Sequence, residues 1–142
     1  DGSEKESLKF KVETLNLSEQ VWFYGSCFDE KKNAELVYNA DLCVAPGNIG
    51  LTAIHSLMFG CPALTHGDFK YQMPEFEAIT PMKTGNFFER DNTNALADSI
   101  VDWFHLNYDK REEVRLCCYH EIDSSWNPEY QMSIFRSVIH DR

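Results

Sequence analysis

The sequence predicts an α/β domain whose parallel sheet is covered by helices on both faces. Short apolar segments rich in β-prone residues alternate with longer segments whose apolar residues recur at helical spacing. Such alternation is typical of parallel sheets, because helices make the crossovers between parallel strands. The chain has 142 residues, of which 43% are hydrophobic, and this is enough for one core. We expect strands at 21–24, 42–45, 62–65 and 86–88, and helices at 3–15, 29–39, 51–59, 94–108, 110–122 and 128–140.

The chain begins with a predicted helix, which is followed by a short predicted strand that ends at Gly25. The helix at 3–15 has Ser3 as a possible cap, and its apolar residues recur on one side. The segment VWFY at 21–24 is short, apolar and β-prone, and Gly25 ends it. We therefore expect residues 21–24 to form a buried strand.

The next part of the chain repeats the order of helix and strand. The helix at 29–39 leads to the strand at 42–45, which Pro46 stops. The helix at 51–59 ends near Gly60, a residue suited to a helix C-terminus. The expected apolar stripe of this helix consists of Leu51, Ile54, Leu57 and Met58.

The last part of the chain is mostly helical. A polar loop at 66–73 and a short helical turn at 74–79 separate the strand at 62–65 from the weaker strand at 86–88. Three helices follow. In the last of them Pro128 suits the first helical position, and Asn127 suits the cap.

Composition and charge exclude several classes of function. With 13 Lys and Arg against 23 Asp and Glu, the formal net charge is −10, which argues against binding of nucleic acid or anionic lipid. No apolar run reaches the roughly 18 residues that a membrane span needs. The five cysteines show no metal-ligand spacing, so we expect reduced thiols, as in a cytoplasmic protein, and no metal site.

One strand-to-helix junction suggests a ligand site. The strand at 42–45 runs into a loop with two glycines, Gly47 and Gly50, and a helix starts at once. Backbone N–H groups of such a loop and of the first helical turn suit a phosphate group. An ordinary Pro/Gly turn has the same local pattern. No Lys or Arg lies between Lys32 and Lys70, so a compensating cation must come from outside this stretch.

The whole chain resembles the C-terminal half of group 1 glycosyltransferases, retaining enzymes of the two-domain GT-B fold. The segment at 38–46, YNADLCVAP, is similar to the family pattern "YxxADLxVxPS". The residues at 21–25, at 50–51 with 60–63, at 74–75 and at 85–88 are similar to further family patterns in the family's order. The resemblance implies a Rossmann-like domain that binds a nucleotide sugar over residues 1–142. It also implies an absent N-terminal acceptor domain and a sheet incomplete at its N-terminus, which another segment or a second chain would complete.

The resemblance also assigns roles to residues. The backbone at Asn48, Ile49 and Gly50 would contact the donor sugar. Leu51 and Thr52 would meet the diphosphate. The strand end at Tyr24, with Gly25 and Ser26, would lie near the nucleobase.

The chain departs from the family at a pair of glutamates. Gly47 stands at the first position and His55 at the second, where the family's glutamate binds ribose hydroxyl groups. A ring nitrogen of His55 could do the same, and Asn48 or Asp68 could replace the first carboxylate. The sequence assigns no catalytic residue.

Two further residues at the predicted ligand edge have open roles. His66 ends the strand at 62–65 and either contacts the donor or is capped or solvated. Glu75 follows Pro74 at a helix start, where it either binds a sugar hydroxyl group or stabilises the helix end. Gln72 is a weaker companion of Glu75.

The function that we expect is transfer of a sugar from a nucleotide diphosphate, such as UDP, to a glycan or lipid-linked acceptor. GT-B enzymes as a rule need no bound metal, so no cofactor is expected. We expect a cytoplasmic protein, with the whole enzyme possible at the inner face of the membrane. Two alternatives stay open: a sugar-nucleotide epimerase of similar fold, and a non-catalytic module that binds a nucleotide sugar or a partner.

Overall fold

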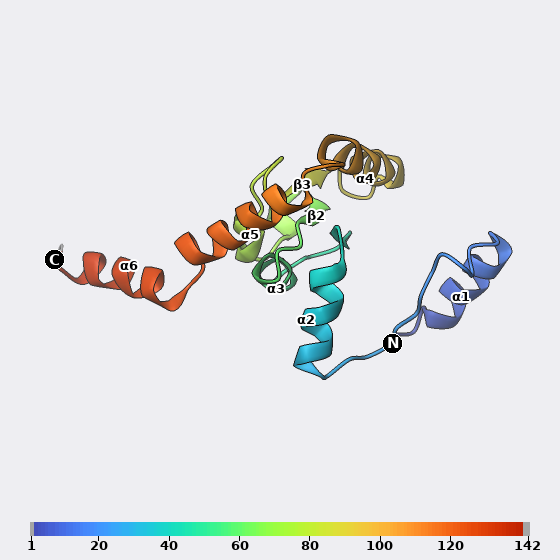
Figure 1. Cartoon of the computed structure of the whole chain (residues 1–142), viewed down its shortest axis with the longest axis horizontal. Helices are drawn as coiled ribbons and strands as arrows, with labels where there is room; N and C mark the ends of the chain where they lie inside the picture. Colours follow the sequence, from blue (N-terminus) through green and yellow to red (C-terminus); the bar gives the residue numbers. More distant parts are fainter. Residues whose placement is uncertain (1, 141–142) are drawn as a thin grey trace. The chain divides into compact units, whose positions relative to one another are not determined.

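A computed structural model describes residues 2–140 of the chain (Figure 1). The chain forms two compact units, one ending at Ala34 and the other beginning at Glu35. Helix α2 (Glu30–Asn39) crosses this boundary. Asp29 caps it, since one carboxylate oxygen accepts the N–H groups of Lys31 and Lys32 at 2.9 and 3.1 Å.

The first unit contains helix α1 (Lys5–Thr14) and an irregular segment. The expectation of a buried strand at 21–24 is wrong. These residues form no strand, and Trp22 is 72% exposed. A β-prone sequence becomes a strand only when its N–H and C=O groups have a neighbouring strand to pair with, and no strand in residues 2–140 pairs with this one.

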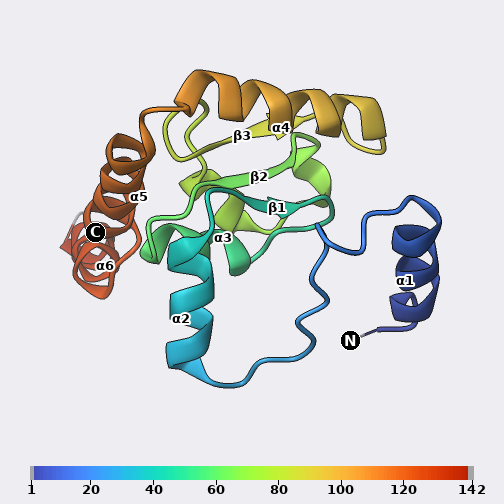
Figure 2. The same cartoon turned by 45° about the vertical axis from the view of Figure 1, so that its right-hand side comes forward.

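The second unit is built on a parallel sheet, as predicted. Its three strands lie in the order β1 (Cys43–Ala45), β2 (Ala63–His66) and β3 (Gly85–Phe88) (Figure 2). Cys43 pairs with Ala63, and Ala63 pairs with Gly85. All strands run the same way, so their carboxyl ends meet at one edge.

The crossovers between the strands are helical. Helix α3 (Thr52–Met58) joins β1 to β2, and the 3₁₀ turns η1 (Phe69–Tyr71) and η2 (Pro74–Ala78) join β2 to β3. Every residue of β2 is buried, so both faces of the central strand are covered. One core cluster fills the space between the sheet and α3, with Ile49, Ala53, Ala63 and Ile79 as its buried members.

A second core cluster involves the later helices. Helices α4 (Thr93–Asn107) and α5 (Arg111–Ser125) join α3 and η2 around Leu57 and Trp103. Helix α6 (Pro128–His140) follows. The cap predicted for α6 is confirmed, because Asn127 Oδ1 accepts the N–H of Tyr130 at 2.8 Å. In the part of the chain that the structure describes, no helix is long and apolar enough to cross a membrane.

Helix α3 differs from its prediction in the face that it buries. Leu57 is buried, but Leu51 is 62% exposed and Met58 is 49% exposed. The buried positions are small as well as apolar, since Ala53 and Ser56 lie against the sheet side. The predicted stripe followed hydrophobicity alone, whereas close packing on β2 favours small side chains.

Candidate functional site

The loop after β1 and the end of β2 are joined at the carboxyl edge of the sheet. The hydroxyl group of Thr65, in β2, donates to the carbonyl of Ala45 at 2.8 Å and lies 3.1 Å from that of Gly47. Thr65 is fully buried. The first part of the loop is therefore held in place by a side chain of the neighbouring strand.

Gln72 ties the rest of this loop to β2. Its Oε1 accepts the backbone N–H of Ile49 at 3.0 Å. Its Nε2 lies 2.9 Å from Thr65 Oγ1, 3.1 Å from the carbonyl of His66 and 3.4 Å from that of Gly47. Both ends of the amide are thus used, and Gln72 fixes the loop more extensively than its sequence position suggested.

The same loop presents backbone donors that remain available. The N–H groups of Asn48, Gly50 and Leu51 have no acceptor within residues 2–140. Gly50 has a φ of +46°, and Leu51 has right-handed helical angles. A left-handed residue followed by a right-handed one directs successive N–H groups into a concavity that suits an anion. Asn48 and Leu51 are exposed, so a ligand can reach the loop.

A carboxylate oxygen without a partner lies in the next crossover. Glu75 Oε2 is buried and has no hydrogen-bond partner in the part of the chain described. Glu75 belongs to η2, which packs against α3. Nearby, Asn48 Oδ1 accepts the N–H of Met73 at 3.3 Å, which joins the loop to the segment before Glu75. A buried oxygen of this kind is costly unless something donates to it.

The two predicted histidines have different surroundings. His66 is 2% exposed, and its Nδ1 accepts the N–H of Asp68 at 3.2 Å, as the capped alternative expected. His55 is exposed on α3, and its backbone N–H donates to the carbonyl of Leu51 at 3.0 Å. Since side chains of a helix lean toward its N-terminus, His55 can extend toward the loop, where Thr52 is also exposed.

Two residues of the prediction belong to the other compact unit of the chain. Gly25 and Ser26 belong to the first unit, where Gly25 has a φ of +85°.

Two cations follow the carboxyl ends of β2 and β3. Lys70 lies in η1, and the Arg90 guanidinium stacks 3.8 Å from the ring centre of Tyr71 and lies 3.5 Å from Asp68 Oδ2. In residues 2–140 no group of three or more His, Cys, Asp or Glu side chains could hold a metal ion, and the expected lack of a metal requirement stays a prediction.

Solved structures show the same fold. Sucrose-phosphate synthase from Thermosynechococcus elongatus is 22% identical, with a TM-score of 0.74 over 99% of this chain and 36% of that one. The C-terminal domain of a group 1 glycosyltransferase, LpcC, from Francisella tularensis is 20% identical, with a TM-score of 0.70 over 87% and 63%. HepE from Anabaena, solved in complex with UDP, is 16% identical, with a TM-score of 0.71 over 95% and 36%.

A family model extends this likeness to the sequence. No curated protein matches the chain by sequence. The chain spans about a third of the sucrose-phosphate synthase and of HepE, so the fold is part of a GT-B architecture. Residues 1–115 match the family model "Glycosyl transferases group 1". The chain therefore belongs to the group 1 glycosyltransferases.

Proposed function

We propose that this chain binds the nucleotide-diphosphate sugar of a glycosyl transfer reaction, with the diphosphate at the loop of residues 47–52. The observation that carries the proposal is the set of backbone N–H groups at Asn48, Gly50 and Leu51 that have no acceptor in the part of the chain described. They are held on a loop whose position Gln72 and Thr65 fix. Donors fixed in advance at a leaving diphosphate stabilise the charge that develops there.

The proposed place of the sugar follows from Glu75. Its buried Oε2 has no donor within residues 2–140, and a sugar hydroxyl group can supply one. The loop and the segment before Glu75 are joined through Asn48 and Met73. A sugar next to the diphosphate would thus extend from the loop toward η2.

The charge of the diphosphate needs compensation beyond backbone dipoles. The loop contains no Lys or Arg. Lys70 makes no ion pair within residues 2–140 and follows the end of β2, which makes it the cation that we assign to this role. Arg90 is already paired with Asp68 and Asp91.

The whole reaction requires parts beyond this chain. We assign the acceptor, a glycan or a lipid-linked acceptor, to a second domain, since this chain spans only about a third of the sucrose-phosphate synthase and of HepE. UDP is the nucleotide that we favour, since HepE was solved with it. Action in the cytoplasm, with the enzyme peripheral to the membrane, belongs to the same proposal.

Calorimetric titration of the full-length protein with UDP and UDP-sugars tests the proposal. We expect saturable binding that Glu75→Gln weakens for a UDP-sugar but not for UDP, because Glu75 is assigned to the sugar. The matched control is Glu77→Gln, a change at an exposed glutamate of the same turn. Absence of UDP binding, or equal losses in both variants, would contradict the proposal.

A non-catalytic nucleotide-sugar module is the second candidate. It is favoured by Gly47 and His55, which stand where the family has two glutamates. Saturable donor binding with no transfer and no donor hydrolysis by the full-length protein would identify such a module.

A further inference from the structure

A pocket lies at the amino ends of the sheet strands, opposite the ends that carry the donor loop. Ala40 and Asp41 precede β1, and Gly60 and Pro62 precede β2, so this pocket borders the amino ends of both strands. The ends of α4 and α5 complete it. Its volume is about 240 Å³, which is below the range of about 300–1,000 Å³ typical of sites for whole drug-sized ligands. It suits a single ring.

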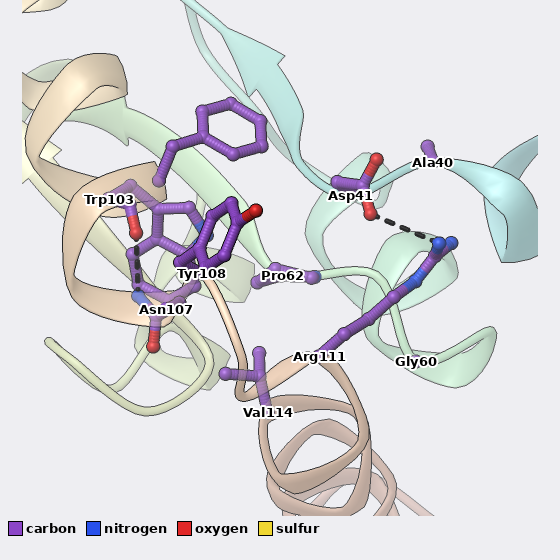
Figure 3. Close-up of a pocket in the computed structure, with 10 residues that line it drawn as sticks. Ala40, Asp41, Gly60, Pro62, Trp103, Asn107, Tyr108, Arg111 and Val114 are labelled. Carbon is purple, nitrogen blue, oxygen red and sulfur yellow. Dashed lines mark hydrogen bonds and ion pairs between the residues drawn. The ribbon is translucent and has the colours of Figure 1, made fainter.

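One wall of this pocket is aromatic. Figure 3 shows Trp103 and Tyr108 on one side, facing Asp41 and Arg111 across Pro62. Tyr108 is 86% exposed, and Phe104 on the same helix end is 45% exposed. Exposed rings beside a hollow are available to the C–H face of a ligand.

Trp103 adds a polar group to this wall. The residue is only 3% exposed and lines the pocket, and no side-chain hydrogen bond of its indole N–H occurs within residues 2–140. The indole nitrogen is not among the buried side-chain atoms that lack a partner in the described residues, so its N–H remains accessible and acts only as a donor. An acceptor atom of a ligand in the pocket would satisfy it.

The opposite wall carries a fixed carboxylate. Asp41 Oδ1 lies 3.1 Å from Arg111 Nη1. Arg111 is itself held by the carbonyls of Tyr38 and Asn39, at 3.3 and 3.0 Å. Asp41 Oδ2 makes no hydrogen bond with the part of the chain described, so it can accept one from a ligand.

We propose that this pocket binds one pyranose ring of a glycan, as a site separate from the donor loop. A pyranose has an apolar C–H face for Tyr108 and Phe104 and hydroxyl groups that both donate and accept. Those hydroxyl groups match the acceptor Asp41 and the donor Trp103. A site at these strand ends would hold a glycan to the protein while the donor occupies the opposite ends.

Saturation-transfer NMR and titration on the full-length protein test this site. The probes are the methyl α- and β-pyranosides of glucose, galactose, mannose and N-acetylglucosamine. We expect at least one to bind, and Tyr108→Ala and Asp41→Asn each to weaken it by about fivefold or more. The matched control is Tyr130→Ala, at an exposed tyrosine of α6, which should bind like the parent.

The same titrations separate this proposal from the donor proposal. Pyranoside binding should be the same with and without saturating UDP, whether or not the donor loop binds as we propose. The inference is wrong if no pyranoside of the panel binds, if UDP displaces it, or if Tyr108→Ala binds as tightly as the parent. Because Tyr108 is almost fully exposed, its loss should leave the fold intact.

Discussion

Gln72 Oε1 accepts the backbone N–H of Ile49 at 3.0 Å, a contact between residues 23 positions apart. Through it the crossover after β2 determines the position of the loop after β1. The loop amides proposed for the diphosphate lie on either side of Ile49. A side chain that touches no phosphate can therefore control how well the phosphate is held.

Replacement of Gln72 should weaken donor binding. Gln72→Ala removes the bonds to Ile49 and Thr65 and lets the loop move, so we expect UDP affinity to fall by about tenfold, measured by calorimetry. Gln131→Ala, on exposed α6, is the control and should bind like the parent. Unchanged affinity in Gln72→Ala would mean that the loop does not hold the diphosphate, or holds it without this support.

His55 gives a second prediction about the donor. If His55 binds the ribose, His55→Ala should weaken UDP binding by about 1 kcal/mol, the scale of one hydrogen bond. His55→Glu restores the family residue and should recover much of the loss. His55 is exposed, so thermal unfolding should hardly change, and His120→Ala on α5 is the matched exposed control. Normal binding in both His55 variants would remove His55 from the site.

Gly85 should be essential for the sheet. A Cβ atom on Gly85 would overlap the backbone carbonyl of Ala63 in β2. Gly85→Ala must therefore push β3 away from β2, and we expect the free energy of unfolding to fall by about 3 kcal/mol in urea titration. Gly47→Ala is the control, since a Cβ there meets nothing within 4 Å. Equal stabilities of the two variants would contradict this packing.

Two buried thiols should make stability depend on alkaline pH. Burial raises the pKa of the Cys61 thiol to about 11 and that of Cys118 to about 12, from 9.0. A raised pKa in the folded state stabilises the protein below pH 9, and this stabilisation is lost as the pH rises toward 11. We expect the urea midpoint to fall over this range and to fall less in Cys118→Ala. Rapid reaction of all five thiols with a thiol reagent at pH 8 would show that these two are not buried.

The sequence predicted most elements of the second unit, but it also predicted a strand at 21–24 that does not form. The strands near 43, 63 and 85 lie where apolar segments meet glycine or proline. Both the apolar segment and the glycine or proline next to it can be read from the local sequence. Residues 21–24 have the same local signal and form no strand, because strand formation depends on a neighbour that a local pattern cannot contain. Leu51, at the start of α3, is exposed although its hydrophobicity predicts packing, because the face that a helix buries also depends on the neighbours against which it packs.

The candidate site was predicted in part. Its glycines were visible as a strand-to-helix junction, but the anchoring role of Gln72 was not, since it depends on a contact across the sheet edge. The only signal for Gln72 is its place between β2 and Pro74. The pocket beside Asp41 and Tyr108 has no sequence signal, since its walls come from residues about 67 positions apart.

The measurement that most directly tests the donor loop is the amide NMR spectrum of the full-length protein during titration with UDP. We expect saturable shifts of the Asn48, Gly50 and Leu51 amide signals, while the amide signal of Tyr108, at the opposite ends of the strands, stays unmoved. The same titration of Gln72→Ala should show smaller shifts at equal UDP concentration. Saturable UDP binding that leaves the three loop amides unmoved, or no binding at all, would show that the diphosphate does not lie at this loop.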